Sequence, residues 1–262
     1  MKENKIWNDY LPEDMQEHWT VYECLKESED SSTFLVKETV TGILCVLKWG
    51  RNRQAEFLRN EMEIMEKMAD RKLSGVPKAY RIFEENGEVY LVREYIEGMS
   101  LAQMVLQKGG ISEAEICRIS RKICQTAEQF QNPDEPMIHR DIKPENIVVT
   151  PGGEVVFIDF GTMRSYKKKT GRVILFVVGT RGTAAPEQYG YIQTDQRTDV
   201  YAIGQTMLYM VSESYEMNQL SECAVSRRMK KIIEKACSFE PDKRYGDAAQ
   251  LRRAVEKCQA KQ

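Results

Sequence analysis

Apolar and polar positions follow two different periods along this chain, and the period changes with position. Short apolar runs at residues 33–36 and 43–48, on either side of the turn pair Thr41-Gly42, are typical of β-strands. In residues 54–68, apolar side chains recur at the spacing of one helix face, with Glu and Lys between them. The pattern therefore predicts paired strands followed by a helix.

Two further strand pairs are predicted from turn residues between apolar runs. Residues 81–84 and 88–92 flank an Asn-Gly pair at positions 86–87, which favours a tight hairpin turn. Residues 147–149 and 155–158 flank a Pro-Gly-Gly turn in the same way. The second hairpin would hold the residues at its two outer ends close together.

Helical periodicity dominates the middle of the chain. It covers residues 101–107 and 113–130, and Ser112 is a suitable N-cap for the second of these helices. Cys117 and Cys124 lie two turns apart on that helix, which indicates a stripe facing the core rather than a thiol pair.

Composition narrows the class of protein. The formal net charge is −2 and the pI is about 5.9, so electrostatics gives no reason to expect a nucleic acid or an anionic membrane as partner. No segment has the roughly 20 apolar residues of a transmembrane helix, and the polar N-terminus lacks a signal region. Seven scattered cysteines indicate reduced thiols, and only two histidines are present, which disfavours a zinc site. These features predict a cytoplasmic protein with no nucleic-acid partner and no membrane segment.

The strongest chemical signal is the stretch at residues 139–146, which reads His-Arg-Asp-Ile-Lys-Pro-Glu-Asn. A second carboxylate, Asp159, follows in an Asp-Phe-Gly triplet. Phosphoryl transfer needs such a set of groups. One carboxylate orients the attacking hydroxyl, a second carboxylate and an amide oxygen bind magnesium, and a cation balances the developing phosphate charge.

These motifs resemble the signature of the protein kinase family, in its eukaryotic-type (Hanks-type) serine/threonine branch. An Ala-Pro-Glu-Gln string at residues 185–188 is similar to that of bacterial members. The resemblance covers roughly residues 20–256. It implies an α+β fold with two lobes, a small β-rich N-lobe with one helix and a larger, mainly helical C-lobe.

The resemblance also implies domain boundaries. Residues 1–20 would be an N-terminal extension that docks on the first lobe, and residues 21–262 would be the kinase domain. Within it, the N-lobe would cover about residues 21–93, the hinge about 94–98 and the C-lobe about 99–262.

By the same resemblance, the catalytic residues are Asp141, Lys143, Lys48 and Glu61. Asp141 would orient the substrate hydroxyl, and Lys143 would neutralise the transferred phosphoryl group. Lys48, at the end of an apolar strand, would hold the ATP phosphates and be fixed by Glu61 on the following helix. Glu63 is the alternative partner for Lys48.

ATP and Mg²⁺ are the implied cofactors. Asn146 and Asp159 would hold Mg²⁺, because this ion prefers oxygen ligands. Glu94 and Ile96 in the hinge would bind the nucleotide by presenting backbone groups to the adenine edge. The residue before them, Arg93, departs from the medium-sized apolar residue that is usual in the family, and a buried guanidinium needs a partner.

The implied partner is a protein substrate that accepts phosphate on serine or threonine. Lys143, two positions after Asp141, and the later Thr180 match the serine/threonine pattern rather than the tyrosine pattern. Glu187 and Arg244 match a pair of residues that forms a buried salt bridge in the family.

The main departure from the family lies in the nucleotide-binding loop. Its three glycines are absent from residues 28–33, where Glu29 and Asp30 add negative charge near an anionic ligand. This leaves a second hypothesis open, a pseudokinase that binds partners without turnover. A small-molecule phosphotransferase of related fold is disfavoured by Arg140 and the Ala-Pro-Glu string.

The segment after the Asp-Phe-Gly triplet carries two hypotheses on regulation. Basic side chains in residues 164–172 either attract a phosphate, for which the same stretch offers Ser165, Tyr166 and Thr170 as acceptors, or form a solvated basic loop. Residues 173–178 are all apolar, which predicts that they pack on the same lobe or on a second copy of the chain. The second arrangement would be a homodimer.

Overall fold

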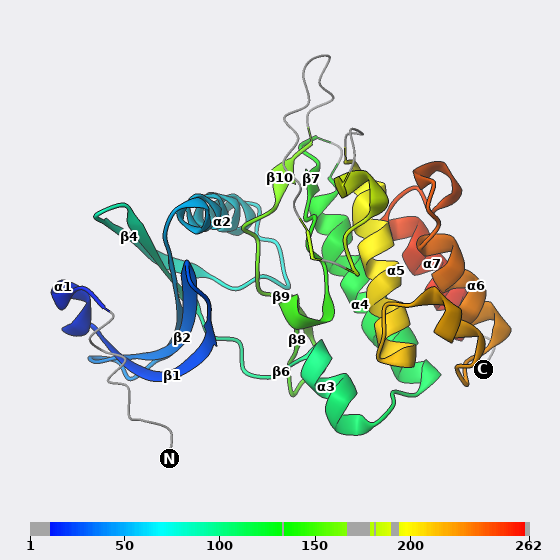
Figure 1. Ribbon diagram of the computed structural model, residues 1–262, viewed down its shortest axis with the longest axis horizontal. Coiled ribbons are helices and arrows are strands. Elements are labelled where there is room, and N and C mark those ends of the chain that lie inside the picture. The colour runs from blue at the N-terminus through cyan, green and yellow to red at the C-terminus, as the bar shows by residue number, and fades with distance from the viewer. Residues whose placement is uncertain (1–10, 133, 167–178, 181, 190–193, 260–262) are drawn as a thin grey trace. The chain divides into compact units, whose positions relative to one another are not determined.

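The chain folds into two compact units in the computed structural model, which describes residues 11–132, 134–166, 179–180, 182–189 and 194–259. The first unit consists of residues 1–72 and 76–96, and the second consists of residues 73–75 and 97–262. Strands dominate the first unit and helices the second (Figure 1).

A five-stranded antiparallel sheet with the order β1-β2-β3-β5-β4 forms the first unit. At the turn between β4 and β5, Asn86 and Gly87 have φ of 50° and 83°, which is the positive-φ geometry expected of an Asn-Gly hairpin. The predicted hairpin is therefore confirmed. The strands are β1 (Trp19–Glu27), β2 (Ser31–Glu38), β3 (Leu44–Gly50), β4 (Ala79–Glu85) and β5 (Glu88–Glu94).

Both faces of strand β5 are buried. Because side chains alternate in direction along a strand, successive residues of β5 belong to different hydrophobic clusters. Val89 and Leu91 pack with helix α2 (Arg53–Asp70) on one face of the sheet. Tyr90 and Val92 belong to a hydrophobic cluster on the other face. Helix α2 confirms the helix that the apolar spacing predicted.

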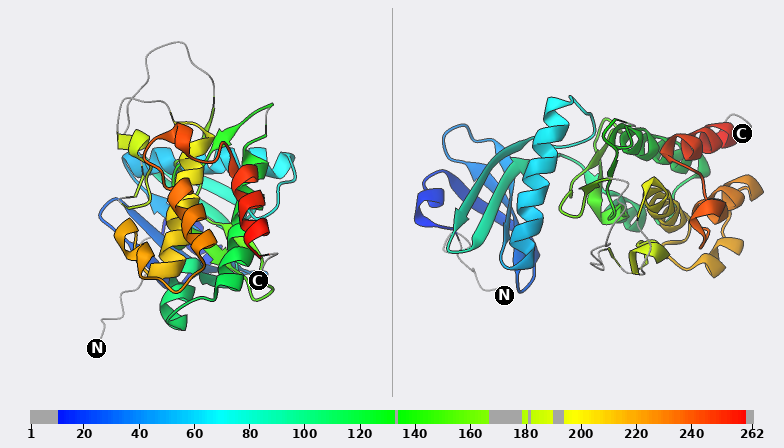
Figure 2. Two further views of the ribbon diagram at one scale, coloured as in Figure 1. Left: turned by 90° about the vertical axis from the view of Figure 1, so that its right-hand side faces the viewer. Right: turned by 90° about the horizontal axis from the view of Figure 1, so that it is seen from above.

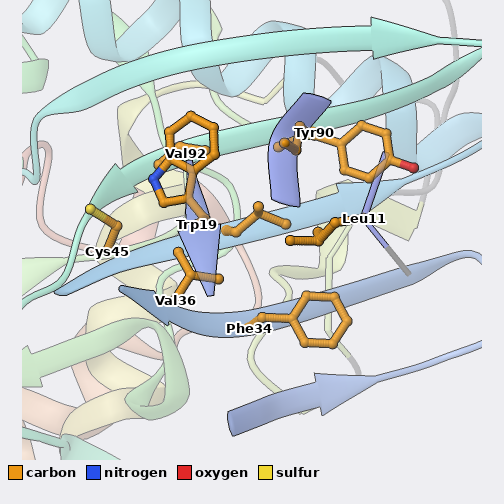
Figure 3. Close-up of a cluster of buried hydrophobic side chains, with 9 residues drawn as sticks. Leu11, Trp19, Phe34, Val36, Cys45, Tyr90 and Val92 are labelled. Carbon is orange, nitrogen blue, oxygen red and sulfur yellow. The ribbon is translucent and has the colours of Figure 1, made fainter. Parts of the chain in front are cut away.

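The residues that precede the sheet fold back onto it. Helix α1 (Glu13–Gln16) buries Met15 completely, and Leu11 and Trp19 lie beside it. Burying a large apolar side chain stabilises the fold by about 1.5–3 kcal/mol. The expected packing of the extension is thus present from Leu11 onward. The other members of the cluster (Figure 3) are Phe34, Val36, Cys45, Leu47, Tyr90 and Val92.

Helix α4 is the central helix of the second unit. Ser112 accepts a hydrogen bond from the Glu115 N–H at 3.3 Å, which confirms it as the N-cap. Figures 1 and 2 show α4 beside α5 and α7. The α-helices of the described part of this unit are α3 (Leu101–Lys108), α4 (Glu113–Phe130), α5 (Gln196–Ser212), α6 (Arg227–Ala236) and α7 (Ala248–Gln259).

Short strands connect these helices to the chemically important loops. Strands β6 (Met99–Ser100), β8 (Ile147–Val149) and β9 (Val155–Phe157) form one sheet, and β8 with β9 is the predicted second hairpin. Strands β7 (Met137–Ile138) and β10 (Arg164–Ser165) form another. The loop that contains Asp141 therefore lies between β7 and β8.

All seven cysteines are free thiols. Cys117 and Cys124 are fully buried on α4, which confirms the predicted core stripe. Burial is the main reason that the pKa of Cys117 is raised to about 12, so this thiol stays protonated near neutral pH. Within the described residues, no helix is long and apolar enough to cross a bilayer.

Candidate active site

The backbone of the loop that carries Asp141 is held by side chains from outside the loop. The buried Asp199 on α5 accepts hydrogen bonds from the N–H groups of His139 and Arg140, both at 2.9 Å. Gln188 Nε2 donates to the Arg140 carbonyl at 2.8 Å. Arg140 has φ of 71°, which is costly for a residue other than glycine. These hydrogen bonds on both sides of its backbone hold it there.

Burial affects the ionisation of Asp199 strongly. It raises the pKa of Asp199 to about 6, while the hydrogen bonds from Arg140 and His139 oppose the rise. Near neutral pH the carboxylate is therefore ionised. In that form it only accepts hydrogen bonds, which suits its two N–H donors.

Asp141 is the centre of a hydrogen-bonded set of side chains. Its Oδ2 lies 2.9 Å from Lys143 Nζ and accepts a hydrogen bond from Asn146 Nδ2 at 3.0 Å. Its Oδ1 accepts from the Thr180 hydroxyl at 2.8 Å, and that hydroxyl accepts from Lys143 at 2.5 Å. The structure thus brings together three of the residues that the sequence singled out, and it adds Thr180.

The β8–β9 hairpin brings Asn146 and Asp159 near each other along the backbone. The Ile158 N–H donates to the Asn146 carbonyl at 3.0 Å, directly before Asp159. Asn146 also uses its amide nitrogen to donate to the Asp141 carbonyl at 3.1 Å. Its amide oxygen is therefore the atom left for a cation. An amide oxygen and the Asp159 carboxylate are the kinds of donor that fit Mg²⁺.

His139 is buried among aromatic rings rather than exposed for chemistry. Its ring centroid lies 5.4 Å from those of Phe157 and Phe160 and 6.3 Å from that of Phe130. Burial lowers the pKa of His139 to about 4, although Asp141 and Asp159 oppose this shift. The imidazole is therefore neutral near pH 7 and belongs to the core that supports the loop.

Glu187 and Arg244 form the predicted buried salt bridge. Two guanidinium nitrogens donate to the two carboxylate oxygens at 2.7 and 2.9 Å, and the side chains are 4% and 0% exposed. Thr198 also donates to Glu187 at 2.9 Å. Burial alone would raise the pKa of Glu187, but the hydrogen bonds, chiefly from Arg244, lower it overall.

In the first unit, Lys48 on β3 forms an ion pair with Glu61 on α2. The two Nζ–Oε distances are 2.7 and 2.9 Å, and the Glu61 side chain is 1% exposed. Glu63, the alternative partner, is exposed and pairs with Lys67 on its own helix at 2.7 Å. The structure therefore places Glu61, not Glu63, against Lys48.

The predicted hinge residues lie at the end of the first unit. Glu94 ends β5, and its carboxylate accepts a hydrogen bond from the Lys78 N–H at 3.0 Å. Ile96 is the last residue of the unit and is half-buried. Arg93 is 3% exposed, and its Nη1 donates to the Glu94 carbonyl at 2.9 Å, so the guanidinium finds a polar partner in the backbone.

The stretch in which the family glycines are absent is a short closed turn. The backbone N–H and the hydroxyl of Ser28 both donate to the Ser31 carbonyl, at 2.8 and 2.9 Å. Asp30 Oδ1 lies 2.8 Å from Arg51 Nε, so the guanidinium compensates one of the two negative charges that the sequence places in this stretch. Thr33 lies in β2, so the loop is shorter than residues 28–33.

Sequence reasoning missed part of the support around Asp141. From the sequence, Thr180 indicates only serine/threonine specificity, and no role is predicted for Asp199 or Gln188. These residues lie far from Asp141 along the chain, so no local pattern identifies their contacts. The proposed acceptor Thr170 and the apolar run 173–178 lie outside the described residues, and dimerisation through that run stays a prediction.

Comparison with known proteins identifies the family. The model of the protein kinase domain matches residues 20–258, which is most of the chain. The chain therefore belongs to the protein kinase family, and the resemblance drawn from the motifs is confirmed. This family has the two-lobed α+β fold that the resemblance implied, so the predicted fold class is confirmed as well.

Several of the most similar curated relatives are bacterial. Serine/threonine-protein kinase D of Synechocystis sp. is 30% identical over 221 residues, which cover 76% of this chain and 42% of the relative. Serine/threonine-protein kinase C of the same organism is 26% identical, over 92% of this chain and 50% of the relative. Serine/threonine-protein kinase PknA of Nostoc sp. is 27% identical, over 77% and 38%. The chain thus spans about half the length of these relatives or less.

Proposed function

We propose that this chain transfers the γ-phosphoryl group of ATP to serine and threonine hydroxyls of proteins. The observation that carries this proposal is the set of contacts of the Asp141 carboxylate. It forms an ion pair with Lys143 and accepts hydrogen bonds from Asn146 and from the Thr180 hydroxyl. The names of the relatives, which are serine/threonine-protein kinases, support the same acceptor group.

Asp141 and Lys143 act on the reacting groups in this proposal. Asp141 already accepts a hydrogen bond from an aliphatic hydroxyl, that of Thr180, at 2.8 Å. A serine or threonine substrate presents the same kind of group, so we assign Asp141 to orient that hydroxyl and take its proton. Lys143, 2.9 Å from the same carboxylate, balances negative charge on the transferred phosphoryl group.

The remaining roles concern ATP and its metal ion. We assign Lys48 to the ATP phosphates, because Glu61 fixes its ammonium group in one position. The backbone at Glu94 and Ile96 is assigned to the adenine edge. Asn146 and Asp159 would hold Mg²⁺, which neutralises phosphate charge when it is bound.

The cellular setting is part of the proposal. Seven free thiols fit a reducing compartment, so we place the protein in the cytoplasm. Its partners in the reaction would be proteins rather than nucleic acids, in keeping with the negative net charge. The pseudokinase hypothesis gains no support from the relatives, which are named as kinases.

Phosphate transfer from radiolabelled ATP to a generic protein substrate tests the proposal. With Mg²⁺ present, we expect label with the unaltered chain and a loss of several orders of magnitude with Asp141→Ala, Lys48→Met or Asp159→Asn. Asp134→Asn is a matched control, because Asp134 is exposed and outside the site. Equal labelling by the unaltered chain and Asp141→Ala would refute the catalytic assignment. ATP binding without any transfer would favour a pseudokinase.

A further inference from the structure

Helices α6 and α7 line an open groove on the second unit, with a volume of about 490 Å³. The two helices, orange and red in Figure 1, pack next to each other. No acidic residue is found among the described residues that line the groove. Five of the lining residues are cationic, namely Arg228, Lys231, Lys235, Arg253 and Lys257.

These five charges have no ionic partner within the described part of the chain. The neighbouring Arg252, which does not line the groove, pairs with Glu128 at 2.6 Å and with Glu256 at 2.8 Å. The groove is therefore a local concentration of unpaired positive charge on a chain whose formal net charge is −2. Such a surface attracts anions at short range.

The charges form two rows, one on each helix. Arg228, Lys231 and Lys235 lie at i, i+3 and i+7 on α6, which places them along one face over about 10 Å. Arg253 and Lys257 lie at i and i+4 on α7, again on one face. About 10 Å is the length of three to four residues of extended chain.

The floor between the two rows is partly apolar. Ile232 is 4% exposed, and Ala254 is half-buried. The Lys235 ammonium lies 4.5 Å from the centroid of the Tyr245 ring and covers one of its faces. Stacking on that face is thus already taken by a cation, which makes the groove a poor platform for nucleotide bases.

We propose that the groove binds an extended acidic segment of a partner protein. Side chains of an extended segment alternate in direction. Consecutive Asp or Glu residues would therefore reach the row on α6 and the row on α7 in turn, while the backbone lies over the apolar floor. This interaction site is separate from the groups assigned to phosphoryl transfer.

Binding of labelled synthetic peptides, measured by fluorescence anisotropy without ATP, tests this proposal independently of kinase activity. We expect a peptide with about four consecutive glutamates to bind, and its glutamine counterpart not to bind. A peptide in which glutamate alternates with alanine places its charges on one side only, so it should bind more weakly.

Paired variants show whether the groove itself is responsible. Lys231→Ala/Lys257→Ala should weaken binding of the acidic peptide about tenfold, because it removes one charge from each row. Arg227→Ala/Lys243→Ala removes the same total charge from exposed positions outside the groove and should leave binding unchanged. Both variants should keep the circular dichroism spectrum of the unaltered chain.

Three results would overturn the proposal. One is an acidic peptide that does not bind. Another is an equal loss of binding in the two paired variants, which would show an effect of net charge alone. The third is a single-stranded oligonucleotide that binds more tightly than the peptide and loses affinity in Lys231→Ala/Lys257→Ala, which would make the groove a nucleic-acid site.

Discussion

At the scale of single residues, one hydroxyl joins the two groups assigned to catalysis. Thr180 donates to Asp141 and accepts from Lys143, so its Oγ1 fixes both side chains at once. Each of these bonds is between an ionised group and a neutral one and is stronger than a bond between two neutral groups. Positioning of this kind affects turnover more than stability.

Thr180→Val removes the hydroxyl and keeps the shape of the side chain. We expect kcat to fall about a hundredfold, because a small misplacement of catalytic groups has effects of this size. Thr180→Ser keeps the hydroxyl and should retain most of the activity. Initial rates with radiolabelled ATP measure both variants, and equal rates in Val and Ser would remove Thr180 from the positioning role.

His139 makes stability depend on pH. Its folded pKa is about 4, below the usual value of about 6.5, so the unfolded chain binds a proton first as the pH falls. The contribution of the neutral His139 to the free energy of unfolding is fully present above about pH 6.5. About 3 kcal/mol of it is lost as the pH falls toward 4. Asp199, whose pKa is raised, contributes with the opposite sign.

His139→Phe should remove this loss, since phenylalanine keeps the aromatic packing and does not titrate. Urea unfolding at several pH values between 7 and 4.5 measures the difference between the variant and the unaltered chain. The contribution of Asp199 is shared by both and cancels in the comparison. The same slope of stability against pH in both proteins would contradict the prediction.

At the scale of elements, β5 owes its burial on both faces to its composition. Its run Val-Tyr-Leu-Val is apolar at every position, so α2 can cover one face while α1 and its neighbours cover the other. Helix α1 is only one turn long and cannot be stable by itself. Its position therefore depends on the burial of Met15.

Met15→Ala should destabilise the first unit by about 2–5 kcal/mol, the usual effect of emptying a buried methionine site. Asp14→Ala, on the exposed side of the same helix, should have little effect. Thermal unfolding followed by tryptophan fluorescence reports the change, because Trp19 belongs to the same cluster. Equal melting temperatures for Met15→Ala and Asp14→Ala would show that the α1 contact contributes nothing.

At the scale of the whole molecule, each unit has an ion pair that connects two of its structural elements. In the first unit, Lys48 and Glu61 connect β3 with α2. In the second unit, Glu187 and Arg244 connect the segment before α5 with the segment before α7. The second pair is buried, so removal of one partner leaves an uncompensated charge in the core.

Arg244→Ala should therefore destabilise the second unit by about 3–5 kcal/mol. Lys243→Ala is the matched control, because Lys243 is adjacent and its pair with Glu240 is exposed. That control should change stability by less than about 1 kcal/mol. Chemical denaturation of both variants gives the two values, and a small change in Arg244→Ala would mean that the pair has no structural importance.

The amino-acid sequence by itself was enough to predict the short-range features of the fold and the family. Periodicity gave α2 and α4, the Asn-Gly pair gave the β4–β5 turn, and the string at residues 139–146 gave the family. These signals are local, because turn geometry, helix faces and the order of a motif depend on residues close together in the chain.

Only the tertiary structure decided which distant residues meet. The tertiary structure pairs Lys48 with Glu61 rather than with Glu63, because only Glu61 lies on the buried face of α2. It also placed Thr180 and Asp199 around the loop of Asp141, and two rows of cations along one groove. Such contacts depend on how elements pack, and packing is set by the burial of apolar faces over the whole unit rather than by the spacing of residues in the sequence.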